Sequence, residues 1–280
     1  MTAETSEVVT TAGAELYVEQ RGDGPPLLMI AGGGGDAGFF SLVGDLLADS
    51  YRVITYDRRG NSRSSRRGGP MEVAQEADDA LAVLQACDVL PALVFGTSGG
   101  AIVGLDLAAR HPGAVAGLVA HEPPVVEILP DADVWRAHFA AVDALYREQG
   151  HEAAEALFQS EIGFAETFAP RPEAAEALQR IHRNFVEMFY VEELLPFTGY
   201  VPDVERIRAN GTRVVMGLGD ASRGRYYGRT PVLLAEQLDC PLVDFPGHHV
   251  AYLEEPERFV AALRTALSAL GDAGASSTAS

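Results

Sequence analysis

Short apolar runs alternate with longer segments in which apolar residues recur at helical spacing. This alternation predicts an α/β fold, in which strands and helices follow one another along the chain. The later runs are continuous and rich in β-branched residues, as is typical of parallel strands that helices cover on both faces. Strands are predicted at residues 6–10, 15–20, 27–31, 52–56, 92–95, 115–120, 213–218 and 241–245.

Helical patterns lie between most of these runs, and the first two strands are expected to form a hairpin around Ala12 and Gly13. Together the patterns predict a mostly parallel eight-stranded sheet with helices on both faces. The predicted helices begin near Phe39, Met71, Gly100, Thr230 and Pro256.

The alternation stops once, between residues 123 and 208, where the sequence is compatible only with helices and is rich in Ala, Glu and Phe. A helical insertion between two strands would cover the carboxyl edge of the sheet, where open α/β sheets bind ligands. We therefore expect a core domain formed by residues 1–122 and 209–270, with a helical cap at 123–208. The Gly/Ala/Ser/Thr tail at 271–280 is expected to be disordered.

Composition limits the class of protein and its location. The chain has 280 residues, of which 47% are hydrophobic and 22% charged, as in soluble globular proteins. No apolar run approaches the roughly 20 residues of a membrane span, and the polar N-terminus has no signal-peptide pattern. Cys87 and Cys240 form neither a disulfide framework nor a metal-ligand spacing. We expect a cytoplasmic protein that binds no metal.

The charge balance limits the partners. The net charge is −19, and all 21 basic residues are arginines, since the chain contains no lysine. Nucleic acid and membranes are therefore not expected as partners, because an acidic surface repels phosphate groups. One loop concentrates arginines, and we expect it to be solvated, with an anion site as the alternative: Arg58, Arg59, Arg63, Arg66 and Arg67.

A G-x-S-x-G motif, Gly96-Thr97-Ser98-Gly99-Gly100, directly follows the predicted strand at 92–95 and precedes a helical pattern. In that setting a sharp turn holds the serine in a strained conformation and exposes its Oγ at the edge of the sheet. Small flanking residues are needed because the strand and the helix pass very close to each other. Ser98 is therefore the candidate nucleophile.

A serine hydroxyl needs a base to remove its proton, and the base needs a third group to orient it. His248 and His249 are adjacent in the turn between the last predicted strand and the last predicted helix. After a G-x-S-x-G serine, the acid and the histidine follow later in the chain, with the histidine last. Neighbouring side chains in a turn point in different directions, so one of the two can face Ser98. We favour His249, with His248 as the alternative.

Two carboxylates are candidates for the orienting group. Asp220 follows the strand predicted at 213–218, but it lies in a polar stretch that is equally compatible with an ordinary turn. Glu122 follows the preceding strand, and its longer side chain can reach the imidazole from there. Pro123 and Pro124 stiffen the chain after Glu122. We favour Glu122 and keep Asp220 as the alternative.

The oxyanion that forms during acyl transfer needs preorganised N–H donors. One candidate is the amide of Gly99, the residue after the nucleophile. The second is Gly33, in the run of four glycines at 32–35 that follows the third predicted strand and allows the backbone to approach a substrate closely. A phosphate cradle is the rival interpretation of this run, but the chain has neither a P-loop lysine nor a GxGxxG pattern.

These motifs together resemble those of the α/β-hydrolase family, serine hydrolase branch, and the match extends over the chain outside the cap. More narrowly, His121-Glu122-Pro123-Pro124 and Pro246-Gly247-His248-His249 are similar to the corresponding segments of the zearalenone lactone hydrolases. In that group the acid is a glutamate after the sixth strand, and the base is the histidine two places after the Pro-Gly glycine. The resemblance therefore implies the triad Ser98, Glu122 and His249.

The expected activity is hydrolysis of a carboxylic ester or lactone through an acyl-enzyme, without a metal or organic cofactor. The substrate is expected to be a small apolar molecule, and a homodimer is left open. A cofactor-free oxygenase or perhydrolase of the same fold and a slow-turnover ligand receptor are the alternatives. Three residues of the cap are candidates for substrate contact: Trp135, Phe189 and Tyr190.

Overall fold

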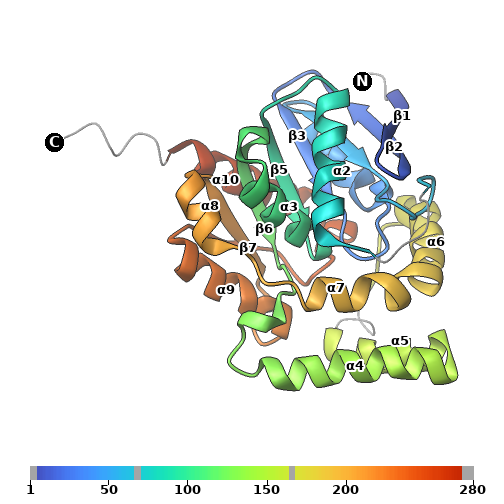
Figure 1. Ribbon diagram of the computed structural model, residues 1–280. Coiled ribbons are helices and arrows are strands. Elements are labelled where there is room, and N and C mark those ends of the chain that lie inside the picture. The colour runs from blue at the N-terminus through green and yellow to red at the C-terminus, as the bar shows by residue number, and fades with distance from the viewer. Residues whose placement is uncertain (1–4, 66–70, 164–167, 273–280) are drawn as a thin grey trace.

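The computed structural model of the chain describes residues 5–65, 71–163 and 168–272 (Figure 1). Its centre is an eight-stranded sheet in the order β1-β2-β4-β3-β5-β6-β7-β8. β2 runs antiparallel to both of its neighbours, and the other neighbouring strands are parallel. The predicted sheet is confirmed, and each strand overlaps its predicted range. The strands are β1 (Thr5–Thr11), β2 (Ala14–Arg21), β3 (Pro26–Ile30), β4 (Arg52–Tyr56), β5 (Ala92–Thr97), β6 (Val115–His121), β7 (Val214–Gly219) and β8 (Leu242–Phe245).

Helices cover both faces of the sheet (Figure 1). Successive strand residues point to opposite faces, so Leu28 and Val94 are buried in one core cluster while Leu27 and Phe95 are buried in the other. The first face is covered by α2 (Val73–Ala86), α3 (Gly99–Arg110), α8 (Val204–Asn210) and α9 (Tyr226–Leu238). The second face is covered by η1 (Ala37–Phe40), α1 (Ser41–Leu47) and α10 (Pro256–Asp272).

The helix expected from Thr230 begins at Tyr226 instead. Proline is common in the first turn of a helix, and a helix that started at Thr230 would have Pro231 in that turn. In the structure Pro231 lies inside α9. A proline there has no N–H to donate to the carbonyl of Tyr227. The Thr230 hydroxyl lies 3.2 Å from that carbonyl, but it is closer to the carbonyl of Pro123.

The segment between β6 and β7 forms a helical layer over the carboxyl edge of the sheet (Figure 1). Within its described residues it contains helices and turns and no strand, whereas α8, at its end, packs into the sheet core through Ile207. An aromatic cluster holds the layer together, with Phe139, Phe158, Phe189 and Tyr190 all buried. The elements of the layer are η3 (Val126–Ile128), α4 (Ala132–Gln149), α5 (His151–Ile162), η4 (Pro172–Ala174), α6 (Ala175–Asn184), the π-helical segment η5 (Phe185–Glu193) and α7 (Leu194–Thr198).

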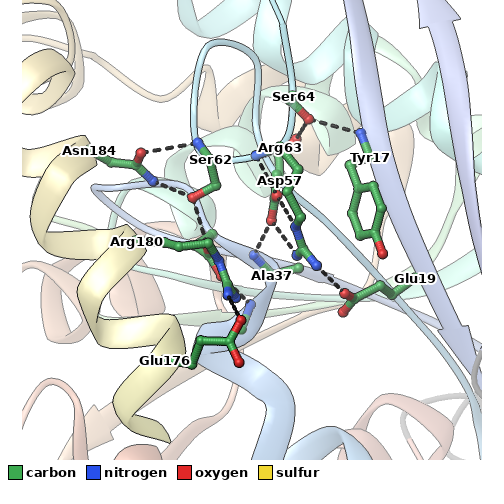
Figure 2. Close-up of polar contacts among 12 residues, drawn as sticks. Tyr17, Glu19, Ala37, Asp57, Ser62, Arg63, Ser64, Glu176, Arg180 and Asn184 are labelled. Carbon is green, nitrogen blue, oxygen red and sulfur yellow. Dashed lines mark hydrogen bonds and ion pairs between the residues drawn. The ribbon is translucent and has the colours of Figure 1, made fainter.

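Polar contacts attach α6 to the loops that follow β3 and β4. Figure 2 shows those between Asn184 and Ser62. The guanidinium of Arg180 donates to both carboxylate oxygens of the fully buried Asp36, at 2.7 and 3.1 Å. The side-chain amide of Asn184 donates to the carbonyl of Gly34 at 2.7 Å, and its oxygen accepts from the backbone N–H of Ser62 at 3.0 Å. The helical layer is therefore tied directly to the glycine loop at 32–35.

The prediction of a solvated arginine loop is wrong for Arg58 and Arg59, which are buried, while Arg66 and Arg67 lie outside the described residues. Arg63 is exposed, with its side chain 29% exposed, although it too is paired with carboxylates. Their carboxylate partners are Glu76 and Glu193 for Arg58, Asp79 for Arg59, and Asp57 and Glu19 for Arg63, the last group being visible in Figure 2. Buried charges must be paired, and a chain with excess carboxylates supplies a partner for each guanidinium.

The chain end differs slightly from expectation, because α10 continues to Asp272, two residues into the predicted tail. Residues 273–280 lie outside the described residues. Across the described part of the chain, no helix combines the length and apolar character needed to cross a membrane. In the same residues, no cluster of His, Cys, Asp and Glu side chains could hold a metal ion, and Cys87 and Cys240 are free thiols.

Candidate active site

Ser98 occupies a strained turn between β5 and α3. Its backbone has φ 54° and ψ −126°, a conformation that non-glycine residues rarely adopt. A Cβ on Gly100 would lie 2.0 Å from the carbonyl oxygen of Ile30, and one on Gly96 would lie 2.3 Å from that of Gly100. Glycine is therefore required at both positions. The Ser98 N–H donates to the carbonyl of His121 at 2.9 Å and holds the turn against β6.

Glu122, directly after β6, is also held in a left-handed conformation, with φ 48°. The residue is fully buried. Its N–H donates to the carbonyl of Gly217 at 3.1 Å, and its Oε1 accepts from the N–H of Gly219 at 2.8 Å. Two bonds to β7 and the following prolines thus fix both the backbone and the carboxylate. Such strain persists only where the surroundings determine it, and it concentrates at functional sites.

His249 makes a hydrogen bond from Nδ1 to Oε2 of Glu122 at 2.6 Å. His249 is 9% exposed, and its ring packs against Tyr227, with ring centroids 4.5 Å apart. Because the carboxylate engages Nδ1, Nε2 on the other side of the ring is left to act as a base. Ser98 and His249 line the same cavity, although these two described residues form no hydrogen bond with each other. A nucleophile–base contact is often long without substrate and shortens when substrate binds.

The two alternative residues are directed elsewhere. His248 pairs through Nε2 with Oε2 of Glu254 at 2.6 Å. Asp220 is exposed, and its Oδ1 accepts from the N–H of Gly247 at 2.9 Å. That bond braces the turn that carries His249, so Asp220 supports the loop and does not contact the imidazole. The structure brings His249 and Glu122 together and leaves His248 and Asp220 apart from them.

His121 is a buried neighbour that sequence reasoning did not single out. Its ring stacks on that of His249 at 6.3 Å between centroids, and its Nδ1 lies 3.0 Å from the hydroxyl of Thr97. Burial lowers the pKa of His121 to about 4, so the ring is neutral near pH 7. Burial opposes the charge of Glu122, but the electrostatic interaction with His121 and the hydrogen bond with His249 bring the pKa of the carboxyl below its usual value. Glu122 is therefore ionised.

A cavity of about 110 Å³ lies between Ser98, His249 and the helical layer. Gly33 and Gly99, the two predicted oxyanion donors, line it together with Ser98. No Asp, Glu or Arg side chain is among its described lining residues. Seven Phe and Tyr side chains are among its lining residues: Phe39, Phe158, Phe185, Phe189, Phe197, Tyr226 and Tyr252.

One polar side chain of the helical layer is left unpaired in this cavity. Gln159, on α5, lines the cavity, and its Oε1 is buried without a hydrogen-bond partner among the described residues. Thr198 lines it as well, but its hydroxyl already donates to the carbonyl of Leu194 at 2.7 Å. Neither Gln159 nor Phe158 was identified from the sequence. The aromatic and amide residues of α5 carry no motif, and only the packing of α5 over the sheet edge brings them to Ser98.

Of the three substrate-contact candidates, the structure brings only Phe189 to the cavity wall. Trp135 lies behind the wall and packs on Tyr226, with centroids 4.6 Å apart. Its indole N–H donates to the carboxylate of Asp131 at 3.2 Å, one turn earlier in the chain, so its hydrogen-bond partner is local. Tyr190 is buried in the aromatic cluster of the helical layer and is also absent from the described lining.

Comparison with known proteins gives consistent results. Residues 25–235 match the family described as alpha/beta hydrolase fold. The uncharacterized hydrolase YraK of Bacillus subtilis is 34% identical over 249 residues, which cover 86% of this chain and 88% of that protein. A zearalenone hydrolase of Bionectria ochroleuca is 26% identical over 263 residues, covering 91% of this chain and 94% of that protein. The enol-lactonase from Burkholderia xenovorans superposes with a TM-score of 0.73 at 18% identity, covering 94% of this chain and 100% of that structure.

Proposed function

Since this chain belongs to the α/β hydrolase fold family, as its motifs predicted, we propose that it is a serine hydrolase of carboxylic esters or lactones. The observation that carries the proposal is the 2.6 Å contact between His249 and Glu122 beside a cavity that Ser98 also lines. The Ser98 backbone strain adds support, because such strain exposes a nucleophile at the mouth of this sheet.

In the proposed reaction Ser98 Oγ attacks the substrate carbonyl while His249 Nε2 takes the hydroxyl proton. Glu122 stabilises the imidazolium that forms, and the N–H groups of Gly33 and Gly99 stabilise the oxyanion of the tetrahedral intermediate. His249 then protonates the leaving alkoxide or phenoxide, which leaves an acyl group on Ser98. Water, activated by the same imidazole, hydrolyses this acyl-enzyme. The proposed chemistry requires no metal or organic cofactor.

The cavity wall supports a neutral, largely apolar substrate. Its described lining has no carboxylate or guanidinium to pair with a charged substrate, and it is rich in aromatic rings. The unpaired carboxamide of Gln159 would pair with a hydroxyl, carbonyl or amide on a part of the substrate that does not react. The similarity to a zearalenone hydrolase and to an enol-lactonase supports lactones alongside open esters.

The test is a panel of aryl esters and macrocyclic lactones assayed with wild-type protein and with Ser98→Ala. We expect hydrolysis by the wild type and its loss in Ser98→Ala, with the thermal unfolding midpoint unchanged as the control for folding. Retained hydrolysis in Ser98→Ala would remove the proposed mechanism. A wild type that ignores the whole panel but forms peracid from hydrogen peroxide would instead be a perhydrolase, and binding without turnover would indicate a ligand receptor.

A further inference from the structure

A fully buried arginine lies directly behind the glycine loop that supplies Gly33. The Nη2 of Arg58 donates to the carbonyl oxygen of Gly32 at 2.9 Å and to Oε2 of Glu193 at 2.8 Å. Arg58 follows β4, while Glu193 is the last residue of the π-helical segment η5 above the sheet edge. One nitrogen atom therefore joins the loop to the helical layer.

The bond to Gly32 fixes the direction of the Gly33 N–H. The two groups belong to one peptide unit, and in a trans peptide the carbonyl and the N–H point in opposite directions. This peptide is trans, because the cis bond of the described chain is Leu90–Pro91. The N–H of Gly35 also donates to the Gly32 carbonyl, at 3.1 Å. With that carbonyl held toward Arg58, the Gly33 N–H points away from the arginine, and Gly33 itself lines the cavity.

Glu193 holds the same loop from the other side. Its Oε2 also accepts from the N–H of Gly34 at 3.3 Å, and its Oε1 accepts from the side-chain amide of Asn61 at 2.9 Å. Phe189, one turn earlier in η5, covers Gly33 so closely that a Cβ there would lie 2.5 Å from the ring. The carboxylate is 1% exposed. The loop is thus enclosed between η5 and Arg58, with no room beside Gly33 for a side chain.

We propose that Arg58 and Glu193 are positioning residues that hold the Gly33 N–H toward the developing oxyanion, and that the helical layer thereby sets the geometry of the oxyanion site. The inference rests on the proposed serine hydrolase function. Neither residue is part of the described cavity lining, so both act through the Gly32–Gly33 peptide and not through contact with substrate.

Glu76 provides a matched comparison. It is also buried and also pairs with Arg58, through Nη1 at 3.3 Å, but it lies on α2, and its carboxylate is bonded to no described residue of the glycine loop. At pH 8, Glu193→Gln and Glu76→Gln each remove one negatively charged partner of the Arg58 guanidinium. In Glu193→Gln, the amide oxygen of the new side chain must take the position of Oε2 to accept from Arg58. Its NH₂ group then takes the position of Oε1 and faces the NH₂ group of Asn61, so that two donors face each other. We therefore expect only this variant to perturb the loop.

The experiment measures kcat and KM of both variants at pH 8 with an aryl ester, together with the affinity for a boronic acid that mimics the tetrahedral intermediate. We expect Glu193→Gln to lower kcat by about 10- to 100-fold, a part of the effect of losing an oxyanion donor, with KM little changed. The boronic acid should bind more weakly by a similar factor. Glu76→Gln should keep kcat within about twofold. Arg58→Lys, which keeps the charge but loses the fork, should resemble Glu193→Gln.

Equal losses of kcat in Glu193→Gln and Glu76→Gln, or a loss confined to KM, would overturn the inference, because both results describe a structural charge cluster alone. If Arg58→Lys does not fold, the comparison of Glu193→Gln with Glu76→Gln still tests the inference. Ser98→Ala distinguishes a failure of this inference from a failure of the proposed serine hydrolase function. If Ser98→Ala remains active, the serine mechanism is wrong, whereas an inactive Ser98→Ala with equal glutamate variants refutes only the role of Arg58 and Glu193.

Discussion

Replacing Glu122 by glutamine removes the charge that orients His249 while keeping the shape of the side chain. The structure fixes how the new amide would lie. The Oε1 position accepts the Gly219 N–H at 2.8 Å, so the oxygen of the amide must stay there. Its NH₂ group then faces Nδ1 of His249, where the carboxylate oxygen now lies at 2.6 Å. A donor at that place favours the tautomer with the proton on Nε2, which cannot accept a proton from Ser98.

The magnitude follows from the burial of the pair. Glu122 is fully buried, and removing one partner of a buried ion pair costs about 3–5 kcal/mol. The imidazolium exists only after proton transfer, so this energy is lost from the transition state and not from the substrate complex. At about 1.36 kcal/mol per factor of ten, kcat should fall by about 10² to 10⁴. KM should change little, because Glu122 is not part of the described cavity lining.

The assay is steady-state hydrolysis of a chromogenic aryl ester, with Asp220→Asn as the matched control. Asp220 is exposed and touches the turn before His249 without touching the ring, so its neutralisation should alter kcat by no more than about threefold. A kcat of Glu122→Gln within about tenfold of wild type would refute the reasoning. The reverse ranking of the two variants would transfer the role to Asp220.

Three further results are expected. Burial raises the pKa of Glu76 to about 7 from its usual 4.5, so the folded protein retains a proton that the unfolded chain releases. The stability that this group contributes therefore falls by at most about 3 kcal/mol as pH rises from 4.5 to about 7. Urea unfolding at pH 5 and pH 8 checks this: the free energy of unfolding of Glu76→Gln relative to wild type should be higher at pH 8 than at pH 5. Thr97→Val leaves the buried Nδ1 of His121 unpaired and should lower the unfolding free energy by about 1–3 kcal/mol, whereas Thr97→Ser keeps the hydroxyl and should not. Equal urea midpoints for the two variants would contradict the role of that hydrogen bond. Gln159→Leu should lower kcat/KM about tenfold for esters that carry a distal hydroxyl and leave plain alkyl esters unaffected, and a uniform change across both sets would show that the amide does not contact substrate.

The sheet and the Ser98 turn could be predicted because their signals are local. Strand pairing follows the apolar runs, and the glycines at 96 and 100 are demanded by contacts within the strand–turn–helix unit and with the adjacent β3. The pairing of His249 with Glu122 was also predictable, since the end of a parallel strand has a known place at the sheet edge. The prolines after Glu122 pointed to a fixed carboxylate.

Contacts between distant segments could not be predicted. Arg58 and Glu193 are 135 residues apart, and nothing in the arginine-rich loop indicates which carboxylates will neutralise it. Trp135 was expected in the cavity because an indole N–H needs a partner, but Asp131 in the same helical turn meets that need. Gln159 reaches the cavity only through the packing of α5. The helical layer is built from side-chain packing, which leaves no motif in the sequence.

Covalent labelling with a fluorophosphonate tests directly whether the Ser98 hydroxyl is the nucleophile activated by His249 and Glu122. The protein is titrated with the reagent, and the intact mass, the modified peptide and the remaining ester hydrolysis are measured on the same samples. We expect one adduct per chain on Ser98, activity lost in proportion to labelling, and much slower labelling of Glu122→Gln. Full labelling of Ser98 with hydrolysis intact, or an adduct on another residue with Ser98 unmodified, would contradict the account.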